Sequence, residues 1–320
     1  MRKLLVILLL CGCAGSRTLV PAAPSQVSLA LRAHTLKLYK ADEPTLGITS
    51  GPDGALWFTE TDKIGRITTS GKLKYYSTLT NSARPFGIAV GPDKALWFTE
   101  GPAGKIGRIT TSGHVSEYPV KPANYSPARI TAGPDGALWF TEGSGNTMYI
   151  GRMTTSGKAS AYLVMEPAGN SSTNGITAGP GKTLWFTIRD ANMVGKITTK
   201  GHIKLFANTD GDSQPSGIAS IGNSLWVGES AGVAHVSAHG KFTEYPLSPS
   251  GSVLAIATGP NAAPWYAVFG VGDIGTIANG KAVEYQAAPT GDGIFGIVEG
   301  KDKALWFTDY NENAIGRFTP

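Results

Sequence analysis

The sequence predicts an all-β fold, a seven-bladed β-propeller, from three observations. All seven tryptophans lie in one recurring phrase, whose fullest form is GPDGALWFTE. The phrase recurs every 39 to 46 residues, and a unit of that size cannot bury a core alone, so neighbouring units must pack together. The last unit also lacks a fourth strand, while a spare strand-like segment precedes the first unit. The tryptophans are Trp57, Trp97, Trp139, Trp185, Trp226, Trp265 and Trp306.

The first unit shows how each repeat forms four short strands. Residues 47–50 and 55–60 are predicted strands, joined by the turn Pro52-Asp53-Gly54, where glycine accepts a positive φ. Residues 63–69 are rich in β-branched side chains, which favours a third strand, and residues 73–77 form the fourth. The second strand has apolar residues on both faces. We therefore expect both faces of each sheet to be covered by neighbouring sheets around an axis.

The ends of the chain predict a closed ring. The last unit offers strands near residues 296–297, 304–308 and 314–319, and no fourth strand follows. Residues 35–40 (TLKLYK) resemble the fourth strands of the other units. We expect them to complete the last blade, because this pairs an edge that would otherwise be open. Residues 34–320 are therefore predicted to form a single propeller domain.

The N-terminal segment predicts export. Arg2 and Lys3 precede an apolar stretch, as in a signal peptide. The sequence Leu10-Cys11-Gly12-Cys13 resembles a bacterial lipobox with Cys13 as the lipidated residue, so residues 1–13 form the signal and residues 14–33 a flexible linker. The alternative is an ordinary secretion signal cleaved near residues 14–16. The protein is then a periplasmic or cell-surface lipoprotein, or otherwise secreted.

Charge and composition limit the partners. The formal net charge is only +5, with 28 basic and 23 acidic residues scattered along the chain. Binding to nucleic acid requires a clustered basic stripe, so we expect no nucleic-acid partner. No apolar run reaches the ~18 residues that span a bilayer as a helix, so we expect membrane association only through the N-terminal lipid anchor. We expect the propeller to be a monomer.

An acid and an arginine recur together in four units. The acid follows Trp-Phe-Thr, and the arginine lies in the next strand. We interpret each couple, such as Glu60 with Arg66, as a cross-strand ion pair within its blade. The alternative is a catalytic role, which we do not favour for a group repeated around the ring because sites are few per protein. The couples are Glu60 with Arg66, Glu100 with Arg108, Glu142 with Arg152 and Asp309 with Arg317.

Three phrases carry a resemblance to a known family. GPDGALWFTE, DKIGRITTSGK and Pro85-Phe86-Gly87-Ile88 resemble the virginiamycin B (streptogramin B) lyases over residues 35–320. The resemblance implies a seven-bladed propeller that opens the ester ring of streptogramin B antibiotics by elimination. It further implies a histidine as general base and Mg²⁺ held through glutamates, with the histidines at the variable position of the Pro-x-Gly-Ile phrase in the last two blades.

The chain departs from that pattern at the implied site. The positions of the two histidines hold Leu254 and Phe295, and Gly293 stands in place of a glutamate. The second glutamate falls near Asp309 or Tyr310, which leaves Asp309 as the one candidate metal ligand. The five histidines are predicted on outer turns and outer strands instead: His34, His114, His202, His235 and His239.

Two functions follow as hypotheses. The first is an exported propeller that binds a small-molecule or peptide-like ligand at its channel mouth, where a mixture of apolar and polar groups suits such a ligand. The second is an active Mg²⁺-dependent carbon–oxygen lyase that opens a cyclic ester or depsipeptide with a different base. Asp292 is the candidate for that base, and the alternative, which we favour, is that it is a turn residue in Thr290-Gly291-Asp292-Gly293. The predicted channel rim consists of Phe86, Arg129, Asn174, Leu254 and Phe295.

Overall fold

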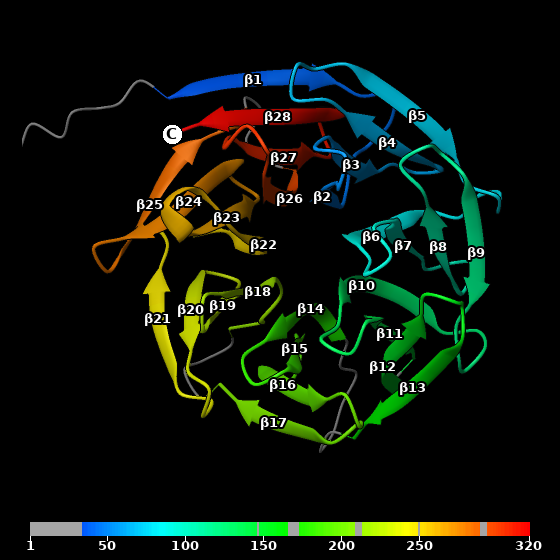
Figure 1. The fold of residues 1–320 in the computed structure, drawn as a ribbon. Coiled ribbons are helices and arrows are strands. Elements are labelled where there is room, and N and C mark those ends of the chain that lie inside the picture. The colour runs from blue at the N-terminus through cyan, green and yellow to red at the C-terminus, as the bar shows by residue number, and fades with distance from the viewer. Residues whose placement is uncertain (1–33, 146, 166–172, 209–212, 249, 289–292) are drawn as a thin grey trace, which may run out of the picture. The chain divides into compact units, whose positions relative to one another are not determined.

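The propeller consists of seven four-stranded antiparallel sheets, each forming one blade. The structure, a computed structural model, describes residues 34–145, 147–165, 173–208, 213–248, 250–288 and 293–320. Figure 1 shows the blades following one another around a central axis, with the chain running outward through each blade. The predicted fold class is confirmed. Cys13, the predicted signal and the predicted linker lie outside the described residues.

The two inner strands of every blade follow each other in the chain. The innermost strands are β2 (Ile48–Ser50), β6 (Pro85–Val90), β10 (Ser126–Ala132), β14 (Thr173–Gly179), β18 (Ile218–Ile221), β22 (Ser252–Thr258) and β26 (Ile294–Glu299). The second strands are β3 (Leu56–Thr59), β7 (Leu96–Glu100), β11 (Ala137–Ser144), β15 (Thr183–Ile188), β19 (Ser224–Gly228), β23 (Pro264–Phe269) and β27 (Leu305–Asp309). A single 3₁₀ turn, Pro260–Ala262, interrupts the described strands.

The two outer strands complete each sheet. The third strands are β4 (Lys63–Ile67), β8 (Lys105–Ile109), β12 (Thr147–Thr154), β16 (Met193–Thr198), β20 (Gly232–Val236), β24 (Asp273–Ala278) and β28 (Ala314–Thr319). The outermost strands are β5 (Leu73–Ser77), β9 (Val115–Pro119), β13 (Ala159–Val164), β17 (Ile203–Ala207), β21 (Phe242–Pro246), β25 (Lys281–Gln286) and, in blade 7, β1 (Thr35–Lys40).

The N-terminal strand closes the ring as predicted. β1 pairs antiparallel with β28, placing Thr35 opposite Thr319 and Lys40 opposite Ala314. Figure 1 shows β1 lying along the outer side of β28. The pairing satisfies the outer edge of β28, which would otherwise expose free backbone groups.

The apolar core lies between neighbouring blades, where each tryptophan meets the next blade. Trp57 of blade 1 shares a buried cluster with Phe98 of blade 2, and Trp97 shares one with Phe140 of blade 3. The second strands, such as β3, are buried on both faces. This arrangement explains why the repeat phrase is apolar at successive positions rather than alternating.

The threonine of the Trp-Phe-Thr phrase ties one blade to the next. The Thr59 hydroxyl accepts a hydrogen bond from the Gly47 amide at 2.9 Å and donates one to the Phe86 carbonyl of blade 2 at 2.9 Å. The same pair of hydrogen bonds recurs in blade 2, where the Thr99 hydroxyl accepts from the Gly87 amide and donates to the Ala128 carbonyl of blade 3. Blades 5 and 6 hold Gly228 and Ala267 at this position. The equivalent threonines are Thr141, Thr187 and Thr308.

The predicted ion pairs between the repeated acids and arginines are wrong. Arg66 Nε donates instead to Asp53 Oδ2 at 2.7 Å, and Asp53 Oδ1 accepts from Trp57 Nε1 at 3.0 Å. Arg66 lies opposite Trp57 in the sheet, beside the turn that carries Asp53. Glu60 lies three residues further along, roughly 10 Å away at ~3.3 Å per residue. The other pairs are Arg108 with Asp93, Arg152 with Asp135 and Arg317 with Asp302.

Candidate ligand-binding channel

A channel of about 150 Å³ is lined by the innermost strands of all seven blades. Five blades contribute a Gly-Ile pair to its wall. The glycines are required because adjacent strands approach closely: a Cβ on Gly87 would lie 2.6 Å from the Ala128 carbonyl oxygen. Blade 3 places Arg129, and blade 6 places Leu254 and Ala255, in the same lining. Among the described residues that line the channel, only Arg129 carries a charge.

Arg129 is a partly buried cation without an acidic partner among the described residues. Its guanidinium carbon lies 4.4 Å from the centre of the Phe86 ring, a favourable cation–π distance. Burial lowers the pKa of Arg129 to about 10, so the guanidinium remains charged at neutral pH. A desolvated cation of this kind favours an anionic group on a ligand.

The other predicted rim residues fall into a polar group and an aromatic group. Asn174 Nδ2 donates to the Ser216 hydroxyl at 3.1 Å. Phe295 packs against Phe269, with ring centres 5.3 Å apart, and against Tyr310 at 5.6 Å. The structure thus brings Phe86 to Arg129 but gives Asn174 and Phe295 partners of their own.

From the sequence we did not predict that three residues of these groups, Ser216, Phe269 and Tyr310, would contact the rim residues. Ser216 occupies the variable position of the Pro-x-Gly-Ile phrase in blade 5, so the repeat register could have identified it. Phe269 and Tyr310 follow the acid position of blades 6 and 7, where the recurring phrase has already ended. No regular spacing marks them.

The described residues do not fit a Mg²⁺ ion held through two glutamates as the resemblance implies. Gly293 has φ +122°, and a Cβ there would meet the Asn311 amide nitrogen at 2.9 Å and Asp309 Oδ1 at 3.0 Å. Asp309 is fully buried and accepts a bond from the Glu312 amide at 3.2 Å. No group of three or more His, Cys, Asp or Glu is gathered in the described part of the chain. Asp292 lies outside it.

The repeated acids form a second set of buried groups, at the ends of the second strands. Glu60, Glu100 and Glu142 are at most 1% exposed, and within the described part of the chain none of their carboxyl oxygens has a hydrogen-bond partner. Burial, together with the nearby Asp42, raises the pKa of Glu60 to about 7. Burial and Glu117 raise the pKa of Glu100 to about 8, and burial alone raises the pKa of Glu142 to about 8.

Blade 5 carries a related acid that the sequence reading did not include. Glu229 follows Trp226-Val227-Gly228 and is 5% exposed. Asn208 Nδ2 donates to Glu229 at 3.0 Å and to Glu244 at 3.1 Å, joining the two carboxyl groups. Burial and the neighbouring Glu244 raise the pKa of Glu229 to about 9.

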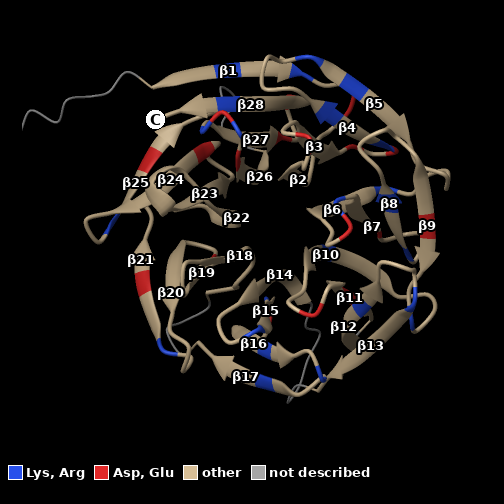
Figure 2. Cartoon of the chain, in the orientation of Figure 1, with Lys and Arg blue, Asp and Glu red and all other residues tan. Residues whose placement is uncertain are grey.

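The surface charges are mixed in sign. Figure 2 shows basic residues on β5 and acidic residues on β9, β21 and β25 along the outer strands; these acids are Glu117, Glu244 and Glu284. Of the described helical segments, none is long and apolar enough to cross a membrane.

Comparison with known proteins identifies close structural relatives. A streptogramin B lyase superposes with a TM-score of 0.82 at 30% identity, covering 89% of this chain and 97% of that chain. Virginiamycin B lyase from Staphylococcus aureus gives 0.81 at 32% identity, covering 90% and 99%. A catalytically inactive variant of that enzyme with quinupristin gives 0.82 at 31% identity and the same coverage. A search of the curated proteins found no match.

The fold and the channel define the class: a seven-bladed β-propeller whose central channel is lined by glycine and aliphatic residues and by one cation, Arg129. The virginiamycin B lyase family model matches residues 25–247 and 223–320. The chain therefore belongs to the virginiamycin B lyase family.

Proposed function

We propose that this protein is an exported, ligand-binding member of its family. The ligand is a small molecule or peptide-like compound with an anionic or hydrogen-bond-accepting group and an apolar part, bound at the channel mouth. The observation that carries the proposal is Arg129, a partly buried guanidinium that lacks an acidic partner among the described residues and lies against Phe86. The absence of histidine at Leu254 and Phe295, and of a glutamate at Gly293, supports binding rather than the family's elimination chemistry.

Quinupristin, the compound seen with the S. aureus variant, is the first ligand to test. We expect calorimetry to show measurable binding of quinupristin. We also expect the ester ring of the compound to remain closed after long incubation with the protein and Mg²⁺. Because elimination adds no water, the opened product is an isomer of the substrate, and chromatography rather than mass must detect it. Arg129→Gln should weaken binding about tenfold, a loss of ~1.4 kcal/mol. Ring opening by the wild-type protein would refute the proposal.

The second candidate function is an active carbon–oxygen lyase. It is favoured by the 30–32% identity to streptogramin-opening enzymes over about nine-tenths of the chain. This function requires a base other than histidine, and Asp292 is the candidate. Turnover of a cyclic ester or depsipeptide that needs Mg²⁺ and is lost in Asp292→Asn would support it. Turnover unchanged in that variant would exclude Asp292 as the base.

Export is part of the same proposal, through the signal at residues 1–13, with Cys13 as the lipid anchor. Some propellers of the same fold are extracellular domains, for example one from a Bacteroides thetaiotaomicron two-component system with TM-score 0.70 at 14% identity. Metabolic labelling with a fatty acid, compared between wild type and Cys13→Ala, distinguishes a lipoprotein from a secreted protein.

A further inference from the structure

Blade 3 contains a pocket that is separate from the central channel lining. The pocket has a volume of about 280 Å³. Its lining comes from the start of β10, the extended hairpin of β11 and β12, and the start of β14. Ala128 and Thr173, which lie directly before Arg129 and Asn174 in the chain, form part of its wall. The lining residues are Ser126, Ala128, Glu142, Gly143, Ser144, Gly145, Thr147, Met148 and Thr173.

Glu142 is the one ionisable side chain in that lining. The residue is 1% exposed, and neither of its carboxyl oxygens has a hydrogen-bond partner among the residues that the structure describes. A buried carboxyl group left without a partner is costly, and such groups call for an explanation. Four hydroxyl side chains share the pocket wall with it: Ser126, Ser144, Thr147 and Thr173.

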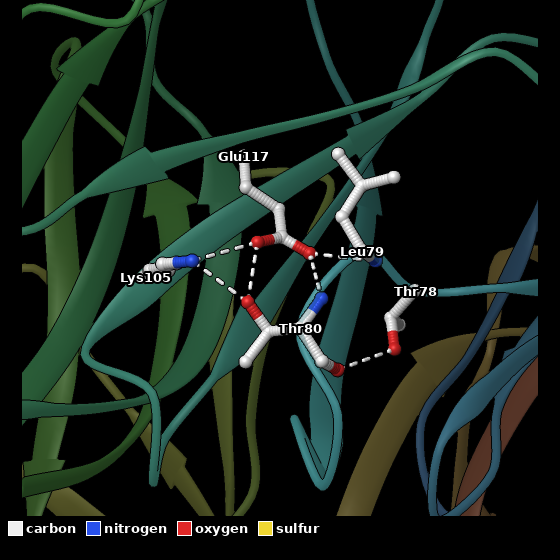
Figure 3. Close-up of polar contacts among 5 residues, drawn as sticks. All are labelled: Thr78, Leu79, Thr80, Lys105 and Glu117. Carbon is white, nitrogen blue, oxygen red and sulfur yellow. Dashed lines mark hydrogen bonds and ion pairs between the residues drawn. The ribbon is translucent and has the colours of Figure 1, made fainter.

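The neighbouring blade has two charged residues close to the equivalent acid, Glu100. In blade 2, Glu117 lies on the outer strand near Glu100, and Lys105 Nζ lies 2.9 Å from Glu117 Oε2. The Thr80 hydroxyl and the amides of Leu79 and Thr80 also donate to Glu117. Figure 3 shows these donors converging on the carboxylate. Blade 2 thus places a lysine opposite Glu100 in the sheet, although that lysine is bonded to Glu117.

Blade 3 has lost both of these charged residues. Tyr149 lies opposite Glu142, where Lys105 lies opposite Glu100. Ala161 lies opposite Gly151 on the outer strand, where Glu117 lies opposite Gly107. Blade 3 therefore retains the acid without the lysine and the second acid of blade 2, and a pocket lies beside Glu142.

We propose that the Glu142 pocket binds a primary ammonium group of a ligand. The single carboxylate matches one positive charge, and the four hydroxyls can accept hydrogen bonds from the remaining N–H groups. A divalent cation would prefer several oxygen ligands with more than one carboxylate. The volume lies just below the ~300–1,000 Å³ typical of whole-ligand pockets, so the pocket accommodates an alkylammonium end of a molecule. This inference does not rest on the function proposed for the channel.

The test uses n-butylammonium as the probe and the full chain as the protein. We expect saturable binding by calorimetry at pH 8.5, and n-butanol, the neutral analogue, should not bind. Glu142→Gln should weaken binding at least tenfold. Glu100→Gln, the matched substitution in blade 2, should leave it within twofold, because Glu100 does not line this pocket.

The pH dependence gives an independent readout. Since the pKa of Glu142 is raised to about 8, ammonium binding must first remove the carboxyl proton. The affinity should therefore fall about tenfold per pH unit below pH 8, and it should not follow this profile in Glu142→Gln. Carbon-13 labelling of the glutamates should show the Glu142 carboxyl ionising as the probe is added at pH 7.

Three results would overturn the proposal. They are no binding at probe concentrations of tens of millimolar, an equal loss of affinity in Glu100→Gln and Glu142→Gln, or tighter binding of methylguanidinium or of Mg²⁺ alone.

Two further variants serve as controls. Thr173→Val, which removes one hydroxyl without changing the charge, should weaken binding about threefold and guards against a folding defect in Glu142→Gln. Arg129→Gln should leave n-butylammonium binding unchanged, so that failure of this site and failure of the channel proposal are distinguishable.

Discussion

Blades 1, 2, 3 and 7 differ from blades 5 and 6 in how they are joined, although all share the same strand order. The first group has an aspartate that binds both the tryptophan and the arginine of its blade, and a threonine that reaches the next blade. Blades 5 and 6 lack both the aspartate and the threonine. The apolar packing between blades is therefore sufficient for the architecture, and the aspartate and threonine hydrogen bonds add stability to one part of the ring.

Blade 4 lies between these groups and shows that the aspartate and the threonine hydrogen bonds are independent. Thr187 still donates to the Ser216 carbonyl of blade 5 at 2.7 Å. The aspartate position holds Gly181, however, and Trp185 Nε1 is buried without a partner. A blade can therefore lose the aspartate network while keeping its link to the next blade.

The largest effect is expected when the inter-blade link is broken. Thr99→Val keeps the side-chain shape but leaves the Gly87 amide and the Ala128 carbonyl without their hydroxyl partner. Each unsatisfied buried group costs about 1–3 kcal/mol, so we expect a loss of about 2–4 kcal/mol in the free energy of unfolding by denaturant. Thr111→Val on the exposed turn should change it little. Equal losses would show that the link contributes nothing specific.

A smaller loss is expected from the aspartate network. Asp93→Ala removes the acceptor of Trp97 Nε1 at 2.9 Å and the partner of Arg108 at 2.7 Å. We expect blade 2 then to resemble blade 4, at a cost of about 2 kcal/mol, measured by thermal unfolding. Arg108→Gln should cost less, because the aspartate retains its bond to Trp97. The reverse order would contradict this account.

Stability should also depend on pH in a way set by the buried acids. The folded-state pKa of Glu100 is raised from 4.5 to about 8, so the unfolded chain releases its proton first as pH rises. The contribution is full below pH 4.5 and is lost between about pH 4.5 and 8, at a slope of at most ~1.4 kcal/mol per pH unit. We expect Glu100→Gln to flatten the decline in unfolding free energy between pH 5 and 8. A wild-type protein that gains stability over this range would exclude the effect.

The turn aspartates have the opposite effect on stability, which they lose as pH falls. Burial opposes their ionisation, but bonds from Trp97 and Arg108 outweigh it and hold the pKa of Asp93 below 3.8. Their contribution is present above that pH and is lost as pH falls through the lowered value. Maximum stability should therefore lie on the acid side of neutrality, near pH 4–5.

The smallest effect is expected at the surface. Lys303 lies 3.0 Å from Glu299, but its side chain is 83% exposed. Exposed pairs contribute about 0–1 kcal/mol, so Lys303→Ala should change the midpoint of thermal unfolding by no more than the experimental scatter. A drop comparable to that of Asp93→Ala would mean that surface charges rather than the aspartate network distinguish the blades.

The sequence predicts the fold well because each tryptophan marks one blade and the third strand of blades 1 to 6 is followed by an outer strand. Even the closure at residues 35–40 follows from the repeat. The partner of Arg66 was mispredicted because two acids, Asp53 and Glu60, recur in the same units. Blade 5 holds the clue: it retains Glu229 without an arginine and lacks the turn aspartate. Arginine and turn aspartate are present or absent together in every blade.

The site was less predictable because it depends on residues that break the repeat. Arg129 stands where five other blades have glycine, which marks it clearly. Phe269, at the end of β23, and Tyr310, directly after β27, contact Phe295 from a position at which the other blades have no aromatic residue. The Glu142 pocket depends on the longer hairpin of blade 3 and on a lysine and a glutamate that are missing there. The absence of the lysine and the glutamate from blade 3 becomes evident only when its strands are compared with those of blade 2.

The pairing of β1 with β28 has a consequence for the order of folding. Residues 35–40 are made before every other strand of the propeller, yet their partners, residues 314–319, are made after all of them. Blades 1 to 6 contain their own four strands and can form as they emerge, whereas the ring stays open until β28 has been made. Contacts so distant in sequence are slow to form, so closure of the last blade should be the final step of folding, and a chain that lacks residues 314–319 should stall as an open arc.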